Sequence, residues 1–325
     1  HGVEAVSWLS FSDIWKALRA SDLLVSGGGS LLQNVTSRRS LYYYMAIIVL
    51  AFLARRPVML YAQGIGPIEG RADREREYLM RLVGNRVRLI TVRDHGSLAE
   101  LEAMGIHRPK IVETADPVLA INPVAKDMGW QVLQWNGVTD DKPLVGISVR
   151  EWKGWQRYKE AFAEAADRIA VELGANLVFL PMQYPEDVKT AETIAAMMKQ
   201  EAIVLDGEFS TAELLSLVGN MDLLIAIRLH ALIFAGVMGV PLVGVSYDPK
   251  IDRFLDSIGE TPAAKLETIT ADELMAEVRR KWQKRDTLCE KNAALLEDLR
   301  RRAFQNAELA VGILRKGASS LEKKN

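Results

Sequence analysis

The sequence predicts an α/β protein of two domains, each built on a parallel β-sheet. Short apolar runs alternate with segments of helical period along most of the chain, which is typical of parallel sheets covered by helices on both faces. The 325 residues suffice for two hydrophobic cores. One segment rich in Gly, Pro and Asp interrupts the alternation. We therefore expect an N-terminal domain over 1–121, a linker over 122–142, a C-terminal domain over 143–285, and a C-terminal helix and tail over 286–325.

The elements of the first domain follow from their patterns. Buried parallel strands are short, continuous apolar runs, and such runs lie at 23–25, 57–61, 88–92 and 110–113. Helical patterns lie between them at 41–54, 73–86 and 95–104. The longest apolar run, 41–53, is shorter than the roughly 20 residues that span a bilayer, so we expect a buried helix there. The chain starts at His1 in mid-pattern, which leads us to expect a truncated N-terminus.

The second domain repeats the alternation. Its predicted strands lie at 143–149, 175–180, 202–205, 222–227 and 241–247. Its predicted helices lie at 155–173, 185–199, 211–219, 229–238 and 250–257. From about residue 271 to residue 316 the pattern is helical and charged, with a break near Asp286. We expect this long segment to cross back onto the first domain.

The amino-acid composition argues against some classes of function. A net charge of −1 gives no overall field for polyanions, so we expect no nucleic-acid partner. The single cysteine, Cys289, excludes an internal disulfide and a cysteine-based zinc site, and we expect it to be a partly buried helix residue. One free cysteine fits a reducing compartment, so we expect a cytoplasmic protein. The basic residues of the terminal helix predict either a solvated face or peripheral contact with an anionic membrane surface.

A group of charged side chains follows the strands of the second domain. The apolar run 222–227 ends in Arg228 and His230, while Arg150, Gln183 and Lys250 follow three other predicted strands. Ligands of open α/β sheets bind outside the carboxyl ends of the strands. Arginine suits planar carboxylates and phosphates, and histidine changes its charge near neutral pH. These side chains predict a site for a small, highly charged anion, although a salt bridge for Arg228 and a purely structural histidine remain alternatives.

The first domain has polar strand ends as well. A glycine-rich turn that contains Gly28, Gly29 and Ser30 follows the first strand, and glycines let a backbone approach a ligand closely. The other predicted ligand-binding residues of this domain are Gln33, Gln63, Arg93 and Asp94, with Asp116 after the fourth strand. Each of them alone fits a turn or a helix cap equally well. Together they predict one edge of a cleft between the two domains.

These motifs resemble those of the polysaccharide pyruvyl transferase family. The resemblance rests on Ser-Gly-Gly-Gly-Ser at 26–30, Gln-Gly-Ile-Gly-Pro at 63–67, Ser-Val-Arg at 148–150 and Arg-Leu-His-Ala at 228–231, and it runs from about residue 20 to residue 315. It is closest to the bacterial cell-surface-anchoring enzymes that pyruvylate secondary cell-wall polysaccharide. The resemblance implies a glycosyltransferase-B-like fold of two Rossmann-like domains facing across a cleft. It also implies transfer from phosphoenolpyruvate to a β-N-acetylmannosamine residue of a lipid-linked glycan, forming a 4,6-linked pyruvate ketal and releasing phosphate.

The resemblance assigns roles to particular residues. Arg228 and His230 match the arginine and histidine of the family's active site, and Lys250 matches its basic residue after the following strand. We add Arg150 and Gln183 to the donor site from their positions, and we expect His230 to act as general acid or base. The polar residues of the first domain would face the glycan acceptor. We expect no metal and no cofactor, with phosphoenolpyruvate as co-substrate.

Two other functions compete with this one. The first is a nucleotide-sugar-dependent glycosyltransferase or epimerase of the same architecture, which the absence of a clear acidic ribose-binding residue after 228–230 disfavours. The second is a non-catalytic module that binds a glycan or an anion. A histidine set among three cations argues for catalysis over simple binding.

Overall fold

The computed structural model describes residues 2–29, 31, 38–65 and 74–322. The chain divides into two compact units. Unit 1 comprises His1–Ala120 and Leu299–Asn325, and unit 2 comprises Ile121–Asp298. Within the described residues, no helix is both long and apolar enough to cross a membrane. The prediction of two domains with parallel sheets is confirmed, and each unit is described below by itself.

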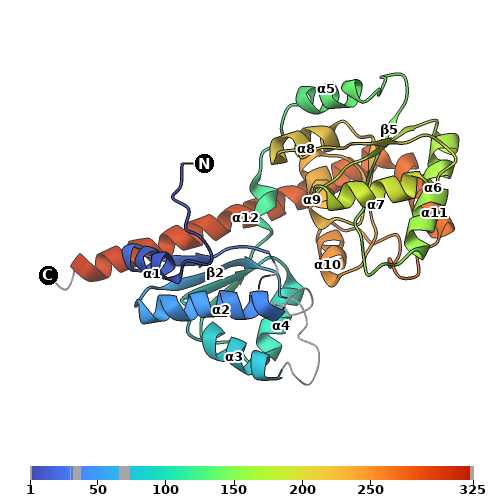
Figure 1. The fold of residues 1–325 in the computed structure, drawn as a ribbon. Helices are drawn as coiled ribbons and strands as arrows, with labels where there is room; N and C mark the ends of the chain where they lie inside the picture. Colours follow the sequence, from blue (N-terminus) through green and yellow to red (C-terminus); the bar gives the residue numbers. More distant parts are fainter. Residues whose placement is uncertain (1, 30, 32–37, 66–73, 323–325) are drawn as a thin grey trace. The chain divides into compact units, whose positions relative to one another are not determined.

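The sheet of unit 1, whose strand β2 is labelled in Figure 1, has four parallel strands in the order β1-β2-β3-β4. The strands are β1 (Leu24–Ser26), β2 (Val58–Gln63), β3 (Leu89–Val92) and β4 (Lys110–Glu113). The helices are α1 (Phe11–Ala20), α2 (Arg38–Leu53), α3 (Arg74–Gly84) and α4 (His95–Ala103), with a 3₁₀ turn η2 (Pro117–Ala120). One apolar core, which includes Leu41, Leu60, Ile90 and Leu101, joins the helices to the sheet. The run 41–53 is part of helix α2, as expected.

The sheet of unit 2 has five parallel strands in the order β7-β6-β5-β8-β9. The strands are β5 (Leu144–Ser148), β6 (Asn176–Phe179), β7 (Ile203–Val204), β8 (Leu223–Ala226) and β9 (Leu242–Gly244). The helices are α5 (Asp127–Trp135), α6 (Arg157–Leu173), α7 (Glu186–Ala195), α8 (Thr211–Gly219), α9 (Leu229–Met238), α10 (Pro249–Ser257) and α11 (Ala271–Gln283). Because the chain adds strands on one side of β5 and then returns to its other side, the strand order reverses between β5 and β8. Such a reversal is where open α/β sheets bind their ligands.

Helices cover both faces of the unit 2 sheet. One core joins β5, β6, β8 and β9 to helices α6, α7 and α11, with Ile147, Phe162, Ile225 and Met275 among its buried residues. Helices α8 and α9 pack on each other, α9 contacts β8 and β9, and α5 packs on α8. Capping boxes begin α8 at Ser210 and α11 at Thr270, each with a glutamate three residues later, which fixes where these helices start.

The terminal helix belongs to both units, as the prediction of a crossing helix requires. Helix α12 (Arg285–Glu322) lies in unit 2 up to Asp298 and in unit 1 from Leu299 onward. In unit 1, the buried Asn306 accepts a hydrogen bond from Thr114 Oγ1 at 2.8 Å and donates to the Ala115 carbonyl at 3.1 Å. The predicted break near residue 286 lies at Lys284, between α11 and α12. Cys289 lies in α12, as expected, but its side chain is outside the described part of the chain.

Two parts of the chain are more regular than predicted. Helix α1 was not predicted. The segment expected to be a linker, 122–142, holds helix α5 and belongs to unit 2. There the Gly129 N–H donates to Ser216 Oγ of helix α8 at 2.8 Å. The correction has a physical reason: Gly129 and Gly137 break the helical pattern in the sequence, yet Gly129 is what allows the two helices to approach closely.

Candidate active site

The candidate donor site lies at the carboxyl ends of strands β5 and β8, where the strand order of unit 2 reverses. Ser148 of β5 pairs with Ala226 of β8, and the Ile227 N–H continues the ladder to the Ser148 carbonyl at 2.9 Å. Arg150 and Arg228 each follow the paired position of their own strand by two residues. The two arginines therefore leave the sheet at the same edge, from neighbouring strands.

Arg228 is held by a buried carboxylate. Its Nε donates to Asp187 Oδ2 at 3.0 Å, and its Nη2 contacts Asp187 Oδ1 and donates to Gln183 Oε1 at 3.1 Å. Asp187, on helix α7, is 1% exposed and also accepts the Met182 and Gln183 N–H groups at 3.1 and 3.0 Å. The alternative of a salt bridge for Arg228 is therefore realised in the structure. One edge of the guanidinium is fixed, while 16% of the side chain remains exposed.

Arg150 packs against a pair of aromatic rings, Trp152 and Tyr247, whose centroids are 4.5 Å apart. Its guanidinium carbon is 5.1 Å from the centroid of the Trp152 ring and 5.0 Å from that of Tyr247. Its Nη1 donates to the Tyr247 hydroxyl at 2.7 Å, while its buried Nε has no hydrogen-bond partner among the described residues. Cation–π contacts with both rings restrict the orientation of the guanidinium. The unpaired Nε–H leaves a donor that a ligand could satisfy.

Lys250 joins the same aromatic group. Its ammonium nitrogen is 5.1 Å from the centroid of the Tyr247 ring and 3.4 Å from Asp248 Oδ2. Asp248 begins helix α10 as its N-cap and accepts the Lys250 N–H at 3.0 Å. Tyr247 therefore brings Arg150 and Lys250 together, as the sequence predicted for these two cations.

His230 is the second residue of helix α9, directly after the buried end of strand β8. Its side chain is exposed, so a ligand at this edge of the sheet can reach the imidazole. Arg228 is the N-cap residue of the same helix, and its side chain makes no cap hydrogen bond. The first turn of α9 thus presents an arginine, a histidine and the positive end of the helix dipole at one place.

Tyr158 holds the backbone of Arg150 in place through a hydrogen bond. The Tyr158 hydroxyl donates to the Arg150 carbonyl at 2.8 Å, and burial raises the pKa of Tyr158, so the hydroxyl keeps its proton. Beside it, the buried Lys159 pairs with Glu151 Oε2 at 2.6 Å. Partial burial opposes charge on Glu151, but the contacts with Lys159 and with backbone N–H groups hold its pKa below the ordinary value.

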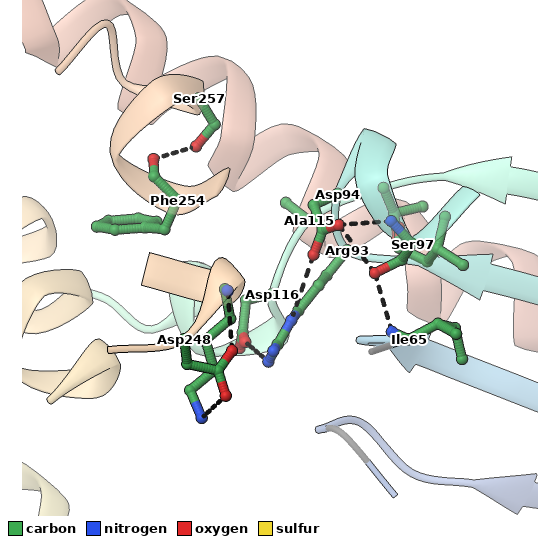
Figure 2. Close-up of polar contacts among 12 residues, drawn as sticks. Ile65, Arg93, Asp94, Ser97, Ala115, Asp116, Asp248, Phe254 and Ser257 are labelled. Carbon is green, nitrogen blue, oxygen red and sulfur yellow. Dashed lines mark hydrogen bonds and ion pairs between the residues drawn. The ribbon is translucent and has the colours of Figure 1, made fainter. Parts of the chain in front are cut away.

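In unit 1, Arg93 and Asp94 follow strand β3 and are largely bonded within the protein. Figure 2 shows Arg93 pointing toward Asp116, whose Oδ2 accepts from Arg93 Nη1 at 3.0 Å. Asp94 caps helix α4 by accepting the Ser97 N–H at 2.7 Å and the Ser97 hydroxyl at 2.8 Å. These contacts join the ends of β3 and β4 and the start of α4. The acceptor-binding role of Arg93 and Asp94 stays a prediction.

Hydrogen bonds connect the glycine-rich turn to Gln63 and Gly64 at the end of strand β2. The Gly64 N–H donates to the Gly29 carbonyl at 2.9 Å, and Gly29 has a φ of +100°, which favours glycine. The fully buried Gln63 uses its amide nitrogen to hold the Ser26 carbonyl at 3.1 Å and the Gly27 carbonyl, while its Oε1 has no partner among the described residues. Gly28 lies beside Pro117. The other two predicted acceptor residues, Ser30 and Gln33, lie outside the described residues.

A cavity of about 220 Å³ adjoins this turn. Its lining includes Ser26 and Gly27 of the turn, Ile14 of α1, and Tyr43 and Tyr44 of α2. It is mostly apolar and offers two aromatic side chains next to the turn that we assign to the acceptor. In the sequence, both tyrosines belong to the apolar run 41–53 that was expected to form a buried helix.

Three functional candidates were missed from the sequence. Asp187 orients Arg228, and the rings of Trp152 and Tyr247 both contact the guanidinium of Arg150. Tyr247 directly follows a predicted strand, so the strand-end argument could have found it. Asp187 lies 41 residues from its arginine, and nothing local in the sequence indicates this pairing. Within the described residues, no group of three or more His, Cys, Asp or Glu side chains could hold a metal ion.

Solved structures with the same fold define the class of protein. The chain resembles the S. aureus MnaA–UDP structure with a TM-score of 0.65 and 11% identity over 94% of this chain and 81% of that one. It resembles the UDP-GlcNAc 2-epimerase of Neisseria meningitidis, bound to UDP-GlcNAc, with a TM-score of 0.62 and 12% identity, over 93% of this chain and 81% of that one. It resembles Anabaena Alr3699/HepE in complex with UDP-glucose with a TM-score of 0.57 and 16% identity, over 96% of this chain and 81% of that one. The protein therefore has a glycosyltransferase-B-like α/β fold, as predicted.

Sequence comparison then identifies the family. The model of the polysaccharide pyruvyl transferase family matches residues 4–249, so the chain belongs to that family of enzymes. A curated relative, the amylovoran biosynthesis protein AmsJ of Erwinia amylovora, is 24% identical over 261 residues. That match covers 74% of this chain and 60% of the relative, so the chain spans about three fifths of the relative's length.

Proposed function

We propose that this protein transfers a pyruvyl group from phosphoenolpyruvate to a sugar of a bacterial polysaccharide or its precursor, forming a cyclic ketal and releasing phosphate. The observation that carries the proposal is the set of Arg150, Arg228, His230 and Lys250, which follow the neighbouring strands β5, β8 and β9 of unit 2. Three cations beside an accessible histidine suit a small anion that undergoes proton transfer. Membership of the pyruvyl transferase family supports the same reaction.

The three cations would bind the two anionic groups of phosphoenolpyruvate, its phosphate and its carboxylate. Arg228, fixed through Asp187, presents one exposed edge of its guanidinium. Arg150 and Lys250, gathered around Tyr247, offer a second positive site. We assign Arg228 and Lys250 to the phosphate and Arg150 to the carboxylate or the phosphate, with Gln183 positioned by Arg228. Clamping the phosphate stabilises the charge that develops as it leaves.

The proposed reaction balances without a redox partner. The vinyl carbon C3 of phosphoenolpyruvate gains a proton, C2 becomes electrophilic, and one sugar hydroxyl adds to C2 with loss of its proton. The C2–O bond to phosphate then breaks. The second hydroxyl adds to C2, and its proton leaves with the phosphate. His230 either protonates C3 or removes a proton from the attacking hydroxyl.

For the acceptor, we propose a β-N-acetylmannosamine residue of a lipid-linked secondary cell-wall polysaccharide precursor, of the kind that anchors S-layer proteins. The glycine-rich turn at Gly28 and Gly29, with Gln63, Arg93 and Asp94, would face this sugar. A lipid-linked acceptor would place the enzyme in the cytoplasm at the inner face of the plasma membrane. The printed name of AmsJ concerns amylovoran biosynthesis, so an exopolysaccharide precursor is the second acceptor to test.

The test incubates the protein with phosphoenolpyruvate and either a lipid-linked N-acetylmannosamine disaccharide analogue or an amylovoran-type oligosaccharide precursor. Phosphate release and the mass of the glycan product are measured together. We expect phosphate and a pyruvylated glycan in equal amounts with one of the acceptors. A parallel thermal-shift series compares phosphoenolpyruvate with uridine diphosphate. Stabilisation by the nucleotide alone, with no glycan product, would favour a nucleotide-sugar enzyme instead.

A further inference from the structure

A second cavity lies in unit 1, at the edge of the sheet opposite to the candidate acceptor residues. It has a volume of about 610 Å³ and is lined by the residues that precede three neighbouring strands. These are 56–58 before and at the start of β2, 86–89 at β3 and 108–110 at β4. Its remaining wall includes Gly312 and Ile313 of helix α12. Because parallel strands begin at this edge and the acceptor residues follow their other ends, the cavity is separate from the acceptor residues.

The lining of this cavity is strongly basic. It contains Arg56, Arg86, Arg88, Arg108 and Lys110, and its one acidic residue is Glu308. The last four basic side chains are exposed, and within the described residues they form no ion pair. The buried Nε of Arg56 likewise has no partner there. Five cations converge on one cavity with a single carboxylate among them, although the chain as a whole is nearly neutral.

Hydrogen bonds hold the basic loops in place. Asn85 Oδ1 accepts the His107 and Arg108 N–H groups at 3.1 and 2.9 Å, and its Nδ2 donates to the Gly105 carbonyl at 3.0 Å. The hydrogen bonds of Asn85 thus connect the loop before β4 to the loop before β3. A site whose backbone is already ordered loses less entropy when it binds a ligand.

The cavity also has apolar walls, with Phe52 of α2 and Leu309 and Ile313 of α12. Its volume falls within the roughly 300–1,000 Å³ of ordinary small-molecule sites, which is far more than a single inorganic ion fills. Arginine pairs with phosphate through two parallel hydrogen bonds. The combination of basic rim and apolar wall suits an organic molecule that carries phosphate groups.

We propose that this cavity binds a phosphate-bearing organic ligand, through Arg88, Arg108 and Lys110, at a site separate from the pyruvyl-transfer site. The phosphate could belong to a soluble phosphate ester or diphosphate, or to the headgroup of a lipid. The inference does not depend on the proposed function, because it rests only on the loops that precede β2, β3 and β4 and on helix α12.

The first test measures binding of sodium pyrophosphate to the full chain by calorimetry at low ionic strength. The double variant Arg88→Ala/Arg108→Ala is compared with Lys16→Ala/Lys142→Ala, which removes the same charge from exposed sites outside the cavity. We expect the cavity variant to bind about tenfold more weakly or worse, because charge-assisted hydrogen bonds are lost, and the control to bind as the wild type does. Equal affinity in all three proteins would overturn the proposal.

A second pair of variants acts by adding a group to the cavity wall. A Cβ at Gly312 meets no heavy atom within 4 Å, so the wall has room for a side chain. Gly312→Asp places a carboxylate among the cations and should weaken pyrophosphate binding, whereas Gly312→Ala should leave it nearly unchanged. Binding that persists in Gly312→Asp and disappears in Arg150→Ala would assign the anion to unit 2 and contradict the proposal.

A third measurement separates the two sources of phosphate. The wild type and the Arg88→Ala/Arg108→Ala variant are sedimented with vesicles of phosphatidylglycerol and phosphatidylcholine. Pelleting of the wild type alone identifies a lipid headgroup as the ligand. Pyrophosphate binding without pelleting identifies a soluble phosphate compound. Absence of both pyrophosphate binding and pelleting would overturn the inference, while pyruvyl transfer could still be observed.

Discussion

At the residue scale, Asp187 explains how an arginine at the end of a strand is held in one orientation. It accepts Arg228 along one edge of the guanidinium and two backbone N–H groups of the loop after β6. A buried carboxylate that accepts this many hydrogen bonds has little freedom to move. Arg228 alone would have several rotamers at this edge, so its geometry depends on a residue that does not itself need to touch the substrate.

Asp187→Asn should therefore raise the KM for phosphoenolpyruvate about tenfold, with a smaller change in kcat, because Arg228 loses the charged partner that orients it. The free energy of unfolding should fall by about 1.5–3 kcal/mol. Steady-state kinetics and urea unfolding measure the two effects. Glu192→Gln, an exposed position on the same helix, is the matched control. Lowered stability with an unchanged KM would reduce Asp187 to a structural residue.

His230→Ala should lower kcat about 10²- to 10⁴-fold, the usual contribution of a general acid or base, without a change in thermal stability. The side chain is exposed, so its removal leaves no cavity in the core. His107→Ala, at an exposed position of unit 1, controls for the loss of an imidazole. Turnover of His230→Ala near the wild-type rate would exclude His230 from proton transfer.

At the element scale, a buried ion pair connects the end of the unit 2 fold to helix α12. Lys281 of α11, 2% exposed, pairs with Glu260, which also accepts from Asn292 Nδ2 of α12 at 3.0 Å. Burial opposes the charge on Glu260, but the hydrogen bonds of Asn292 and Lys281 outweigh it and lower the pKa of this carboxyl. Because the folded-state pKa is the lower one, the pair contributes stability above the unfolded pKa, and this contribution is lost as the pH falls through the folded pKa.

Glu260→Gln should lower the free energy of unfolding by about 3–5 kcal/mol at neutral pH, because Lys281 is left buried without its partner. Denaturant unfolding between pH 3 and pH 7 measures the effect, with the exposed Glu267→Gln as control. The difference from the wild type should shrink below about pH 4, where the wild-type carboxyl begins to be protonated. A difference that stays constant with pH would contradict this ionisation.

Two glycines in helices should respond to alanine in opposite directions. At Gly129 of α5, a Cβ would lie 2.4 Å from backbone atoms of Leu217 and Ser216, so Gly129→Ala forces α5 and α8 apart and should cost about 1–3 kcal/mol. At Gly312 of α12 a Cβ meets nothing, so Gly312→Ala should stabilise by about 0.5–1 kcal/mol. Urea midpoints measure both. Equal shifts of the same sign would show that close packing does not control the α5–α8 contact.

Gly129 also shows why some elements could not be predicted from the sequence. All nine strands found in the described residues were predicted from apolar runs, because a buried parallel strand needs a continuous apolar stretch whatever its neighbours are. Helix α5 was missed because its glycine is unfavourable in an isolated helix, and only the contact with α8 gives a reason for it. Helix α1 was missed as well, although Phe11, Ile14, Trp15 and Leu18 have the spacing of one helix face.

At the scale of the whole molecule, the strand-end rule predicted which edge of the unit 2 sheet the cations follow but could not describe their partners. Arg150 and Lys250 were predicted to lie together, and Tyr247 brings them together. Arg93 was predicted to face the acceptor, yet its side chain is 8% exposed and bonded to Asp116. Partners such as Asp187 and Asp116 are far away in sequence and are fixed only when the elements pack. Local sequence patterns therefore predict which edge of a sheet holds the polar residues better than they predict which of those side chains are free to bind a ligand.

The most direct test of the account follows the carbon atom at which the ketal forms. Phosphoenolpyruvate labelled with carbon-13 at C2 is incubated with the protein and the N-acetylmannosamine acceptor analogue, and carbon NMR follows the label while phosphate is assayed. The account predicts that the label becomes a quaternary ketal carbon bonded to two sugar oxygens, with one phosphate released for each ketal. Recovery of the label only as phosphoenolpyruvate or as free pyruvate, with this acceptor and with the exopolysaccharide precursor, would contradict it.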